Sequence, residues 1–197
     1  MIDLVIATKN DKKLRELKRY LKSVKAHIIS LRDMPRAPVI REDKNTFRGN
    51  AIKKALTISK FTKGVILADD SGLCVDALGG QPGVKSARFA GRNKKDHDNN
   101  AKLLKMMSRV PAGRRTAHFA CAIAIADNGR AIKVIEEYCS GCIADSVRGR
   151  HGFGYDPLFL IPKYNRTFGE LGLRIKDKMS HRSKALKKAR KFLRKYI

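Results

Sequence analysis

The sequence has 197 residues, of which 43% are hydrophobic, and a formal net charge of +26 at pH 7. This length and apolar content suit one globular domain, or two small lobes that share a cleft, and they argue against a disordered chain. No apolar run is long enough to span a membrane, and residues 1–7 lack the features of a secretory signal, so we expect a cytoplasmic protein. The excess of positive charge indicates a polyanionic partner, either nucleic acid or a phosphate-rich small molecule, unless it is only a solvated surface bias.

The first half of the sequence alternates between short apolar strands and helices. Residues 2–8 form a continuous apolar run that is typical of a buried strand, and Asn10 stands where a helix N-cap belongs. This alternation predicts an α/β fold. The elements expected next are a helix over 11–23, a strand over 27–31, a polar loop over 36–45, a helix over 47–61, and a strand over 65–68 that ends at Asp69-Asp70-Ser71-Gly72.

The second half contains the longest predicted strand and helix. Residues 116–126 alternate between large apolar residues and alanine, which is typical of a strand, and a turn over 127–130 leads into a returning strand. We therefore expect a long antiparallel hairpin over 116–142. Helices are also predicted over 99–107 and over 180–196, the latter with a basic outer face, and a glycine-rich loop over 149–157. Together these elements predict a mixed, twisted sheet with surrounding helices and a cleft where the loops converge.

The sequence has four cysteines, two of which form the C-x-x-C pair Cys139 and Cys142. A zinc site needs two further ligands at a matching spacing, and the sequence offers no obvious pair. We expect the cysteines to be small, partly buried residues on strands.

A first candidate site opens the helix that follows the first strand. Thr8, Lys9, Asn10 and Lys13 stand at the N-terminus of this helix, where free backbone N–H groups and the helix dipole attract phosphate. The segment lacks the glycines of a Walker loop. An ordinary N-cap with a lysine-rich first turn would account for the same residues.

A second candidate site is the pair of carboxylates Asp69 and Asp70 at the end of an apolar strand. Neighbouring carboxylates in such a place are costly unless they are paired, hydrated or bound to a metal. Mg²⁺ uses one or two carboxylates together with phosphate oxygens and water, and a carboxylate can also accept a proton from an attacking water. A polar turn with an aspartate cap is the alternative.

Two later segments offer groups that recognise a nucleotide. Phe153 and Tyr155 stand between glycines in a loop that can stack on a flat base, and Asp156 can accept hydrogen bonds from a purine edge. A tight turn with core aromatics is the alternative. Further on, His181 and Arg182 follow a Ser180 N-cap, where they can hold a base carbonyl or a phosphate. Cations in a first turn oppose the helix dipole, and such local conflicts are typical of functional sites.

Four segments occur in a characteristic order: residues 7–10 with 13–17, residues 68–73 with 78–84 and 86–88, residues 152–157, and residues 180–182 with 184–186. Together they resemble the inosine/xanthosine triphosphate pyrophosphatases, the Ham1-like family. The resemblance implies a single domain over 1–197 with two lobes, an elongated α/β fold with a central nucleotide-binding cleft, and a homodimer. It also implies Mg²⁺-dependent hydrolysis of ITP, dITP and XTP to the monophosphate and pyrophosphate, which cleanses the nucleotide pool.

The resemblance also assigns roles to individual residues. Asp70 would be the general base and a Mg²⁺ ligand, Asp69 and Glu42 would be further metal ligands, and Ser71 would touch the substrate. The triphosphate would lie on the segment from Thr8 to Lys13. The residues that would hold the base and phosphates are Phe153, Gly154, Tyr155, Asp156, Lys176, His181 and Arg182.

The sequence departs from the family pattern at several positions that are often acidic in relatives. Arg41 stands near the position of an expected metal ligand, a role that Glu42 or Asp43 would take over, and Gly49 replaces a glutamate. Arg174 and Ile175 are further departures. A second interpretation is a nucleic-acid-binding protein on the same scaffold, with weak or lost catalysis and the basic last helix as its docking face. A third is a related pyrophosphatase with a pyrimidine or modified-base preference.

Overall fold

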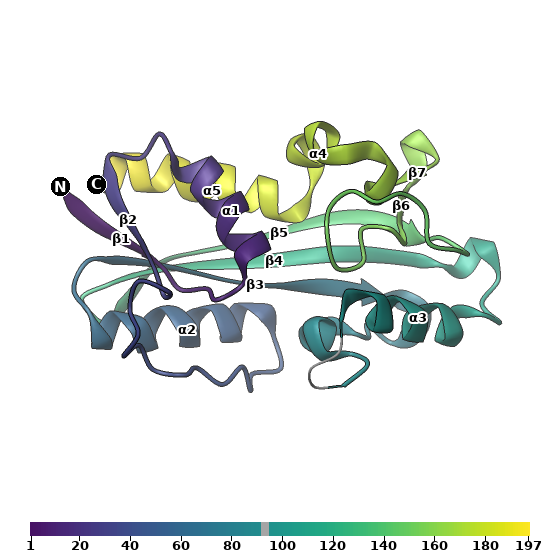
Figure 1. The fold of residues 1–197 in the computed structure, drawn as a ribbon, viewed down its shortest axis with the longest axis horizontal. Helices are drawn as coiled ribbons and strands as arrows, with labels where there is room; N and C mark the ends of the chain where they lie inside the picture. The colour runs from purple at the N-terminus through teal and green to yellow at the C-terminus, as the bar shows by residue number, and fades with distance from the viewer. Residues whose placement is uncertain (92–94) are drawn as a thin grey trace. The chain divides into compact units, whose positions relative to one another are not determined.

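The structure is a computed structural model that describes residues 1–91 and 95–197. Among these residues, seven strands form one sheet in the order β2-β1-β3-β4-β5-β6-β7. β1 is parallel to β2 and β3, whereas β6 is antiparallel to β5 and β7, so the predicted mixed α/β fold is confirmed (Figure 1). The elements are β1 (Ile2–Ile6), α1 (Asp11–Leu21), β2 (Ala26–Ser30), α2 (Phe47–Phe61), β3 (Val65–Val75), α3 (Asp96–Met107), β4 (Thr116–Asp127), β5 (Arg130–Ile143), β6 (Phe159–Ile161), β7 (Arg166–Thr167), α4 (Phe168–Met179) and α5 (His181–Tyr196).

The chain divides into two compact units. Unit 1 consists of Met1–Asp70, Cys121–Glu137 and Arg182–Ile197, and unit 2 consists of Ser71–Ala120 and Tyr138–His181. The chain therefore passes from one unit to the other four times, at 70–71, 120–121, 137–138 and 181–182. Strands β3, β4 and β5 contribute residues to both units.

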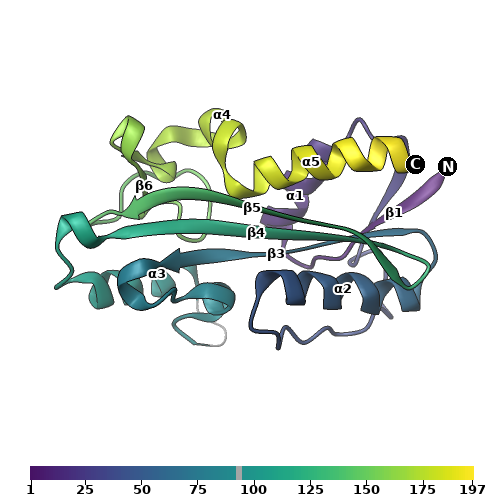
Figure 2. The ribbon, with the colours of Figure 1, turned by 180° about the vertical axis from the view of Figure 1, so that it is seen from behind.

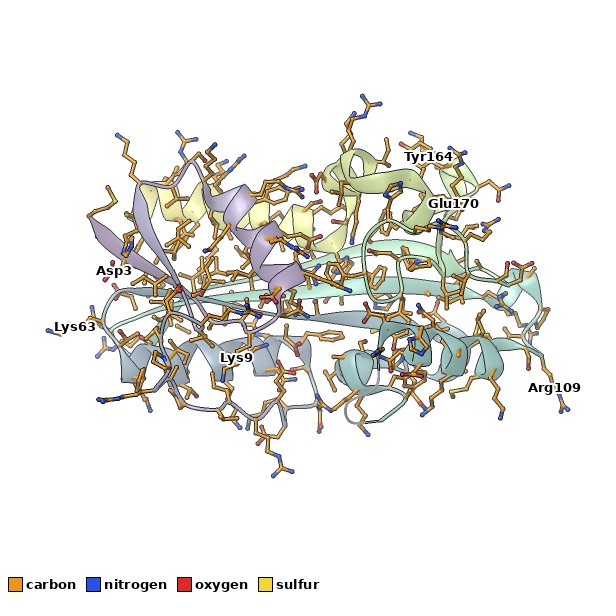
Figure 3. All side chains as sticks on the ribbon, in the orientation of Figure 1. Asp3, Lys9, Lys63, Arg109, Tyr164 and Glu170 are labelled. Atoms are coloured by element: carbon orange, nitrogen blue, oxygen red, sulfur yellow. The ribbon has the colours of Figure 1, made fainter. Side chains whose placement is uncertain are left out.

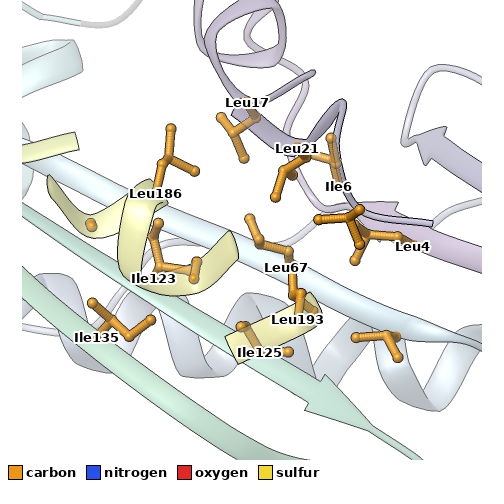
Figure 4. Packing of buried hydrophobic residues seen from close by; sticks show 14 of the residues in the cluster. Leu4, Ile6, Leu17, Leu21, Leu67, Ile123, Ile125, Ile135, Leu186 and Leu193 are labelled. Atoms are coloured by element: carbon orange, nitrogen blue, oxygen red, sulfur yellow. The ribbon is translucent and has the colours of Figure 1, made fainter. Parts of the chain in front are cut away.

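In unit 1, α1 and α5 lie on one face of the strands and α2 lies on the other (Figures 1 and 2). Leu17 of α1 and Leu186 of α5 pack on Ile123 of β4 within one buried cluster (Figure 4). On the opposite face, the small residues Ala122 and Ala124 of β4 belong to the cluster that contains the buried side of α2. The predicted alternation of large and small residues in β4 is confirmed, and it allows both faces of the strand to be covered.

In unit 2, the core is built around aromatic side chains. Phe119 of β4 lies 4.4 Å from Phe159 of β6 between ring centroids, and Phe159 lies 5.5 Å from Phe168 of α4. Leu103 and Met107 of α3 belong to the same buried cluster. Burial of these large apolar surfaces is the main source of stability of the unit.

The structure corrects several sequence predictions. The strand expected to end at Asp69 continues to Val75, and α4, β6 and β7 were not predicted. The Asn10 N-cap is confirmed, because its Oδ1 accepts a hydrogen bond from the Lys13 backbone N–H at 3.1 Å. Strands β4 and β5 are neighbours in the sheet and are joined through Asn128 and Gly129. Their pairing as one long antiparallel hairpin stays a prediction.

All four cysteines lie on strands, as expected, and all are free thiols. Cys121 and Cys139 are buried, whereas Cys74 and Cys142 are half-buried. Burial raises the pKa of the Cys121 thiol to about 12, so this residue is a core side chain and not a reactive one. In residues 1–91 and 95–197, no helix combines the length and apolar character needed to cross a membrane.

The start of α4 leads to a pH-dependent prediction. The Glu170 carboxylate (Figure 3) accepts a hydrogen bond from the Thr167 backbone N–H at 2.8 Å, which lowers the pKa of Glu170. Because the folded pKa lies below the unfolded one, this stabilisation is present above the unfolded pKa and is lost as pH falls through the folded pKa. Glu170→Ala is therefore expected to lower the melting temperature by a few degrees at pH 7 and by less at pH 3, as thermal melts would measure.

The matched control for this prediction is Glu170→Gln, which keeps a hydrogen-bond acceptor without the charge. It should retain part of the stability at pH 7 and show little dependence on pH. An Ala variant whose deficit is the same at both pH values would contradict the assignment of the hydrogen bond to the ionised carboxylate.

Candidate active site

The carboxylates Asp69 and Asp70 lie within β3 and not in a turn. Consecutive residues in a strand point to opposite faces of the sheet, so the two side chains diverge. Leu67 belongs to the cluster that contains α1 and α5, and Ala68 to the cluster that contains α2. The same parity places Asp69 toward α1 and α5, and Asp70 toward α2.

Asp69 is matched by two cations from distant parts of the sequence. Lys13 Nζ of α1 lies 2.9 Å from Asp69 Oδ2, and Arg182 Nε of α5 lies 3.6 Å from the same oxygen. Arg182 also donates a hydrogen bond to Glu16 Oε2 at 2.8 Å. Burial by itself raises the pKa of Asp69, but Lys13 and Arg182 outweigh burial and bring this pKa to about 2. Asp69 is therefore ionised at neutral pH and orders two cationic side chains.

Asp70 lies in a different electrostatic environment. Asn50 Nδ2 of α2 donates a hydrogen bond to Asp70 Oδ2 at 2.9 Å, and Asn50 Oδ1 is itself fixed by the Lys44 backbone N–H at 2.9 Å. Burial raises the pKa of Asp70, and the nearby Glu42 charge adds to this, whereas Lys54 and Lys13 oppose it. A carboxylate with a raised pKa and a fixed orientation suits a general base.

Glu42 lies in the loop before α2, and its negative charge affects the pKa of Asp70. Its Oε1 lies 2.6 Å from Lys54 Nζ, and its charge contributes to the raised pKa of Asp70. Burial alone would lower the pKa of Lys54, but the charges of Asp69, Asp70 and Glu42 raise it, so Lys54 stays protonated. A buried ammonium ion thus balances part of the negative charge of this cluster.

Two carboxylates of this cluster are candidates to hold a divalent metal ion. Across the described ranges 1–91 and 95–197, no group of three or more His, Cys, Asp or Glu side chains is placed to hold a metal ion. Mg²⁺ does not require such a group, because it uses one or two carboxylates and keeps phosphate oxygens and waters as its other ligands. Asp70 and Glu42 are the candidate pair in unit 1, where the charge of Glu42 contributes to the raised pKa of Asp70.

The loop between β1 and α1 holds the first group of predicted phosphate ligands. Thr8 Oγ1 accepts a hydrogen bond from the Asn10 backbone N–H at 3.2 Å, and Lys9 (Figure 3) is exposed. Because Asn10 caps α1, the N-terminus of this helix is well defined, and it lies beside the Lys13–Asp69 ion pair. The structure therefore brings the start of α1, with Asn10 and Lys13, next to Asp69 of β3 in unit 1.

In unit 2, the glycine-rich loop is organised around a buried ion pair. Asp156 Oδ2 accepts hydrogen bonds from the Phe153 backbone N–H at 2.8 Å and from Lys176 Nζ at 2.5 Å, and the two charged side chains are only 2% and 5% exposed. Gly152 has φ +80°, and a Cβ atom there would clash with Asp156 Oδ2. The Asp156 carboxylate therefore fixes the conformation of the loop through its contacts with Gly152 and Phe153. Lys176 Nζ lies 4.7 Å from the centre of the Phe153 ring.

The remaining residues of the loop are also fixed by their neighbours. The Gly154 backbone N–H donates to Asp96 Oδ2 at 2.9 Å, and its carbonyl accepts from Asn100 Nδ2 at 3.1 Å. Tyr155 belongs to the buried core of unit 2, and its hydroxyl donates to the Ser86 carbonyl at 2.9 Å. Burial raises the pKa of Tyr155. Tyr155 is therefore a core aromatic, and the half-buried Phe153 is the better placed of the two rings for stacking on a base.

This position of Tyr155 leads to a prediction about stability. Tyr155→Phe removes the hydroxyl and leaves the Ser86 carbonyl without its donor, so the free energy of unfolding is expected to fall by about 1–2 kcal/mol. Urea denaturation would measure this loss. Tyr164→Phe, at a position that is 39% exposed, is the matched control and should change stability little. A tenfold rise in KM with unchanged stability would instead show that the Tyr155 hydroxyl contacts the substrate.

The other predicted substrate ligands lie where the chain passes between the units. Ser71 is a half-buried residue of β3 that directly follows Asp70. Ser180 precedes α5 with an extended backbone, and His181 begins the helix. The His181 ring stacks on Phe119 at 4.7 Å with an interplanar angle of 15°, so its orientation is fixed by the core of unit 2.

Three residues that shape these groups were not predicted as site residues. Asn50 and Lys54 lie one turn apart on the buried side of α2, and Glu16 pairs with Arg182. Asn50 and Lys54 are polar residues within the otherwise apolar stripe of a predicted helix. Because buried polar groups need partners, this pattern is a sequence signal that α2 contributes to a site. Glu16 offers no comparable signal, because its partner lies 166 positions away.

The positions that depart from the family pattern are placed as follows. Arg41 is exposed, and Asp43 is paired with Lys53 at 2.8 Å, which lowers the pKa of Asp43. Gly49 lies in the first turn of α2, and its backbone N–H donates to Thr46 Oγ1 at 3.0 Å. Asp43 forms an ion pair with Lys53, whereas the charge of Glu42 contributes to the raised pKa of Asp70.

Comparisons with known proteins agree over nearly the whole chain. The sequence is similar to the dITP/XTP pyrophosphatase of Desulforamulus reducens, with 51% identity over 96% of this chain and 94% of that protein. It is 48% identical to the dITP/XTP pyrophosphatase of Geobacillus kaustophilus, over 95% of this chain and 92% of that protein. The solved structure of a HAM1 protein from Coxiella burnetii superposes with a TM-score of 0.90 at 36% identity, covering 99% of this chain and all 100% of that one. The profile of the Ham1 family matches residues 4–192, and the chain therefore belongs to the Ham1 family.

Proposed function

We propose that this protein hydrolyses non-standard purine nucleoside triphosphates such as dITP, ITP and XTP to the monophosphate and pyrophosphate. Relatives that are 51% and 48% identical to this chain in sequence are named dITP/XTP pyrophosphatases. The observation that carries the proposal is Asp70, a buried carboxylate that is fixed by Asn50 and coupled to Glu42 and Lys54. Removal of these nucleotides would cleanse the cellular nucleotide pool.

The phosphate chemistry is assigned to unit 1. Asp70 accepts a proton from a water molecule whose oxygen attacks the α-phosphorus, and the bond between the α-phosphorus and the oxygen that bridges to the β-phosphorus breaks. Pyrophosphate leaves with that oxygen, and the nucleoside monophosphate remains. Thr8, Lys9 and Asn10 offer hydrogen-bond donors at the N-terminus of α1 to the triphosphate, and Lys13 and Arg182 supply positive charge.

Asp70 and Glu42 are the residues proposed to hold Mg²⁺. When bound there, the ion would neutralise charge on the phosphate oxygens. Asp69 was also predicted as a metal ligand, but its Oδ2 lies against Lys13 and Arg182. We assign to Asp69 the positioning of these two cations.

Recognition of the base is assigned to unit 2, together with Ser71 for contact with the sugar-phosphate part. Phe153 offers a ring face for stacking, and Lys176 and His181 are cationic or hydrogen-bonding groups fixed beside aromatic rings. A donor aimed at the 6-oxo group of hypoxanthine or xanthine would meet the 6-amino group of adenine and lose its hydrogen bond. This loss is the basis of the expected discrimination against ATP and dATP.

The test is pyrophosphate release from dITP, XTP, dUTP and dATP, with and without Mg²⁺. We expect kcat/KM for dITP and XTP to exceed that for dATP by at least about 10²-fold, and turnover to require the divalent ion. Preferential release from dUTP would favour a pyrimidine-directed pyrophosphatase. Release from none of the four would refute the proposed hydrolysis and favour a binding protein on the same scaffold.

We also infer that the protein is a homodimer, as the resemblance to the family implies. Analytical ultracentrifugation at micromolar concentration should give twice the mass of one chain. A single species with the mass of one chain would contradict this inference.

A further inference from the structure

The outer face of α5 carries a concentration of positive charge. The helix sequence His181–Tyr196 contains no acidic residue. Its inner side packs in the core of unit 1, where Ala185 and Ala189 are fully buried together with Leu186 and Leu193, which are labelled in Figure 4. The cations on its remaining circumference are Lys184, Lys187, Lys188, Arg190, Lys191, Arg194 and Lys195.

Five of these cations surround one hollow on the surface, and we call them the α5 basic surface. They are Lys187, Arg190, Lys191, Arg194 and Lys195, and the hollow has a volume of about 480 Å³. Within the part of the chain that the structure describes, no acidic side chain lines this hollow, and Lys188, which lies outside it, pairs with Glu137. Like charges at this density repel each other, so the surface favours binding of a polyanion that neutralises several of them together.

The surface extends beyond the helix. Arg194 also lines an adjoining hollow of about 300 Å³ with Lys25, which follows α1. From Lys187 to Lys195 the helix rises by about 12 Å, at about 1.5 Å per residue. Duplex nucleic acid carries about one phosphate for every 1.7 Å of its axis, so a row of this length faces several phosphates at once. The guanidinium groups of Arg190 and Arg194 match phosphate oxygens in a bidentate geometry.

The structure distinguishes nucleic acid from a lipid surface as the partner. A helix that binds at a membrane interface inserts an apolar face between the lipids. In α5 the apolar face is already buried in the core, and Leu186 and Leu193 are fully covered. The α5 basic surface therefore offers charge and hydrogen-bond donors, and the exposed aromatic ring of the helix, Tyr196, is stacked on Phe192 and donates its hydroxyl to Asp127. We propose that the α5 basic surface binds the phosphate backbone of duplex nucleic acid, independently of base sequence and of the proposed hydrolysis.

The experiment uses a fluorescein-labelled 20-base-pair duplex of mixed sequence and the full chain, with anisotropy read over a series of KCl concentrations. Neutralisation of four to five phosphates gives a slope of about −4 in a plot of log K against log salt. Lys187→Gln, Lys191→Gln and Lys195→Gln in one variant should weaken binding at least about tenfold at 0.1 M salt and make the slope shallower by about 3.

The matched control has the same net charge but changes lysines elsewhere. Lys60→Gln, Lys63→Gln and Lys105→Gln remove three exposed lysines from α2, the segment after it, and α3 (Lys63 is labelled in Figure 3). This variant should bind within about threefold of the wild type. Equal losses in the two variants would overturn the proposal, because binding would then depend on net charge and not on the α5 basic surface.

Two further measurements test whether the duplex binds at the nucleotide site and whether other polyanions bind as tightly. Excess unlabelled dITP with Mg²⁺ should not displace the duplex, and displacement would show capture at the nucleotide site instead. Vesicles of phosphatidylcholine with 30% phosphatidylserine, or a poly-glutamate peptide of equal charge, should bind more weakly than the duplex. Tighter binding of either one that the α5 variant abolishes would overturn the assignment to nucleic acid. Pyrophosphate release, measured on the same samples, should be equal in all variants, so failure of this proposal is distinguishable from failure of the proposed hydrolysis.

Discussion

Replacing Asp70 with asparagine is expected to lower kcat for dITP hydrolysis by about 10³-fold. Asparagine has nearly the same shape, but it cannot accept the proton of the attacking water, and it is a weaker ligand for a divalent ion. The buried Asp70 carboxylate has a raised pKa because of burial and the nearby Glu42 charge, so loss of its charge should not destabilise the fold. Steady-state pyrophosphate release and a thermal melt of the same sample would check both parts.

The control for Asp70→Asn is Glu42→Gln, which separates proton transfer from metal binding. Glu42 lies close to Asp70 but is not proposed to accept a proton. The Glu42 variant should recover much of its turnover at high Mg²⁺ concentration, whereas the Asp70 variant should not. An Asp70→Asn variant that keeps more than a tenth of the wild-type kcat would show that another group is the base.

The second large effect is expected at Arg182. Arg182→Met removes a buried cation that lies 3.6 Å from Asp69 and donates to Glu16 at 2.8 Å. Loss of one partner from a buried ion pair costs roughly 3–5 kcal/mol, because the opposite charge stays buried without full compensation. Domains are stable by only about 5–15 kcal/mol, so this single change removes a large part of the free energy of unfolding.

A double-mutant cycle distinguishes this mechanism from lost packing. If the cost arises from the Asp69 charge, the combined Asp69→Asn and Arg182→Met variant should be more stable than the sum of the single effects predicts. Arg182→Lys, which keeps the charge, should lose less stability than Arg182→Met. Strictly additive effects in urea denaturation would show that the Asp69 charge does not account for the cost of losing Arg182.

The sequence predicted the regular elements well where a local pattern specifies them. The helix over 47–61 has the bounds that its periodicity predicted, and the alternation in β4 was correctly read as a strand. The helix α4 was missed because Gly172, with φ +69°, interrupts its pattern. The start of α4 nevertheless has a local sequence signal, because Thr167 and Glu170 form a capping box.

The sequence named the residues of the candidate site but could not predict how they are arranged in space. The end of β3 was placed too early because two adjacent carboxylates look like a turn when only local sequence is considered. They are tolerated in the strand because their partners, Lys13, Asn50 and Arg182, come from elements far away in the sequence. Similarly, both interpretations of the glycine-rich loop were open, and only tertiary packing shows that Tyr155 is a core residue.

Asp69 and Asp70 point to opposite faces of the sheet. The number of residues that precede them in β3 therefore matters as much as which residues these are. Deletion of one residue from 65–68 would exchange the two carboxylates between the faces of the sheet. The side chain that needs Lys13 and Arg182 would then point at α2, and the proposed base would point at two cations that hold it permanently ionised. We therefore expect the apolar residues over 65–68 to accept apolar substitutions but no change in their number.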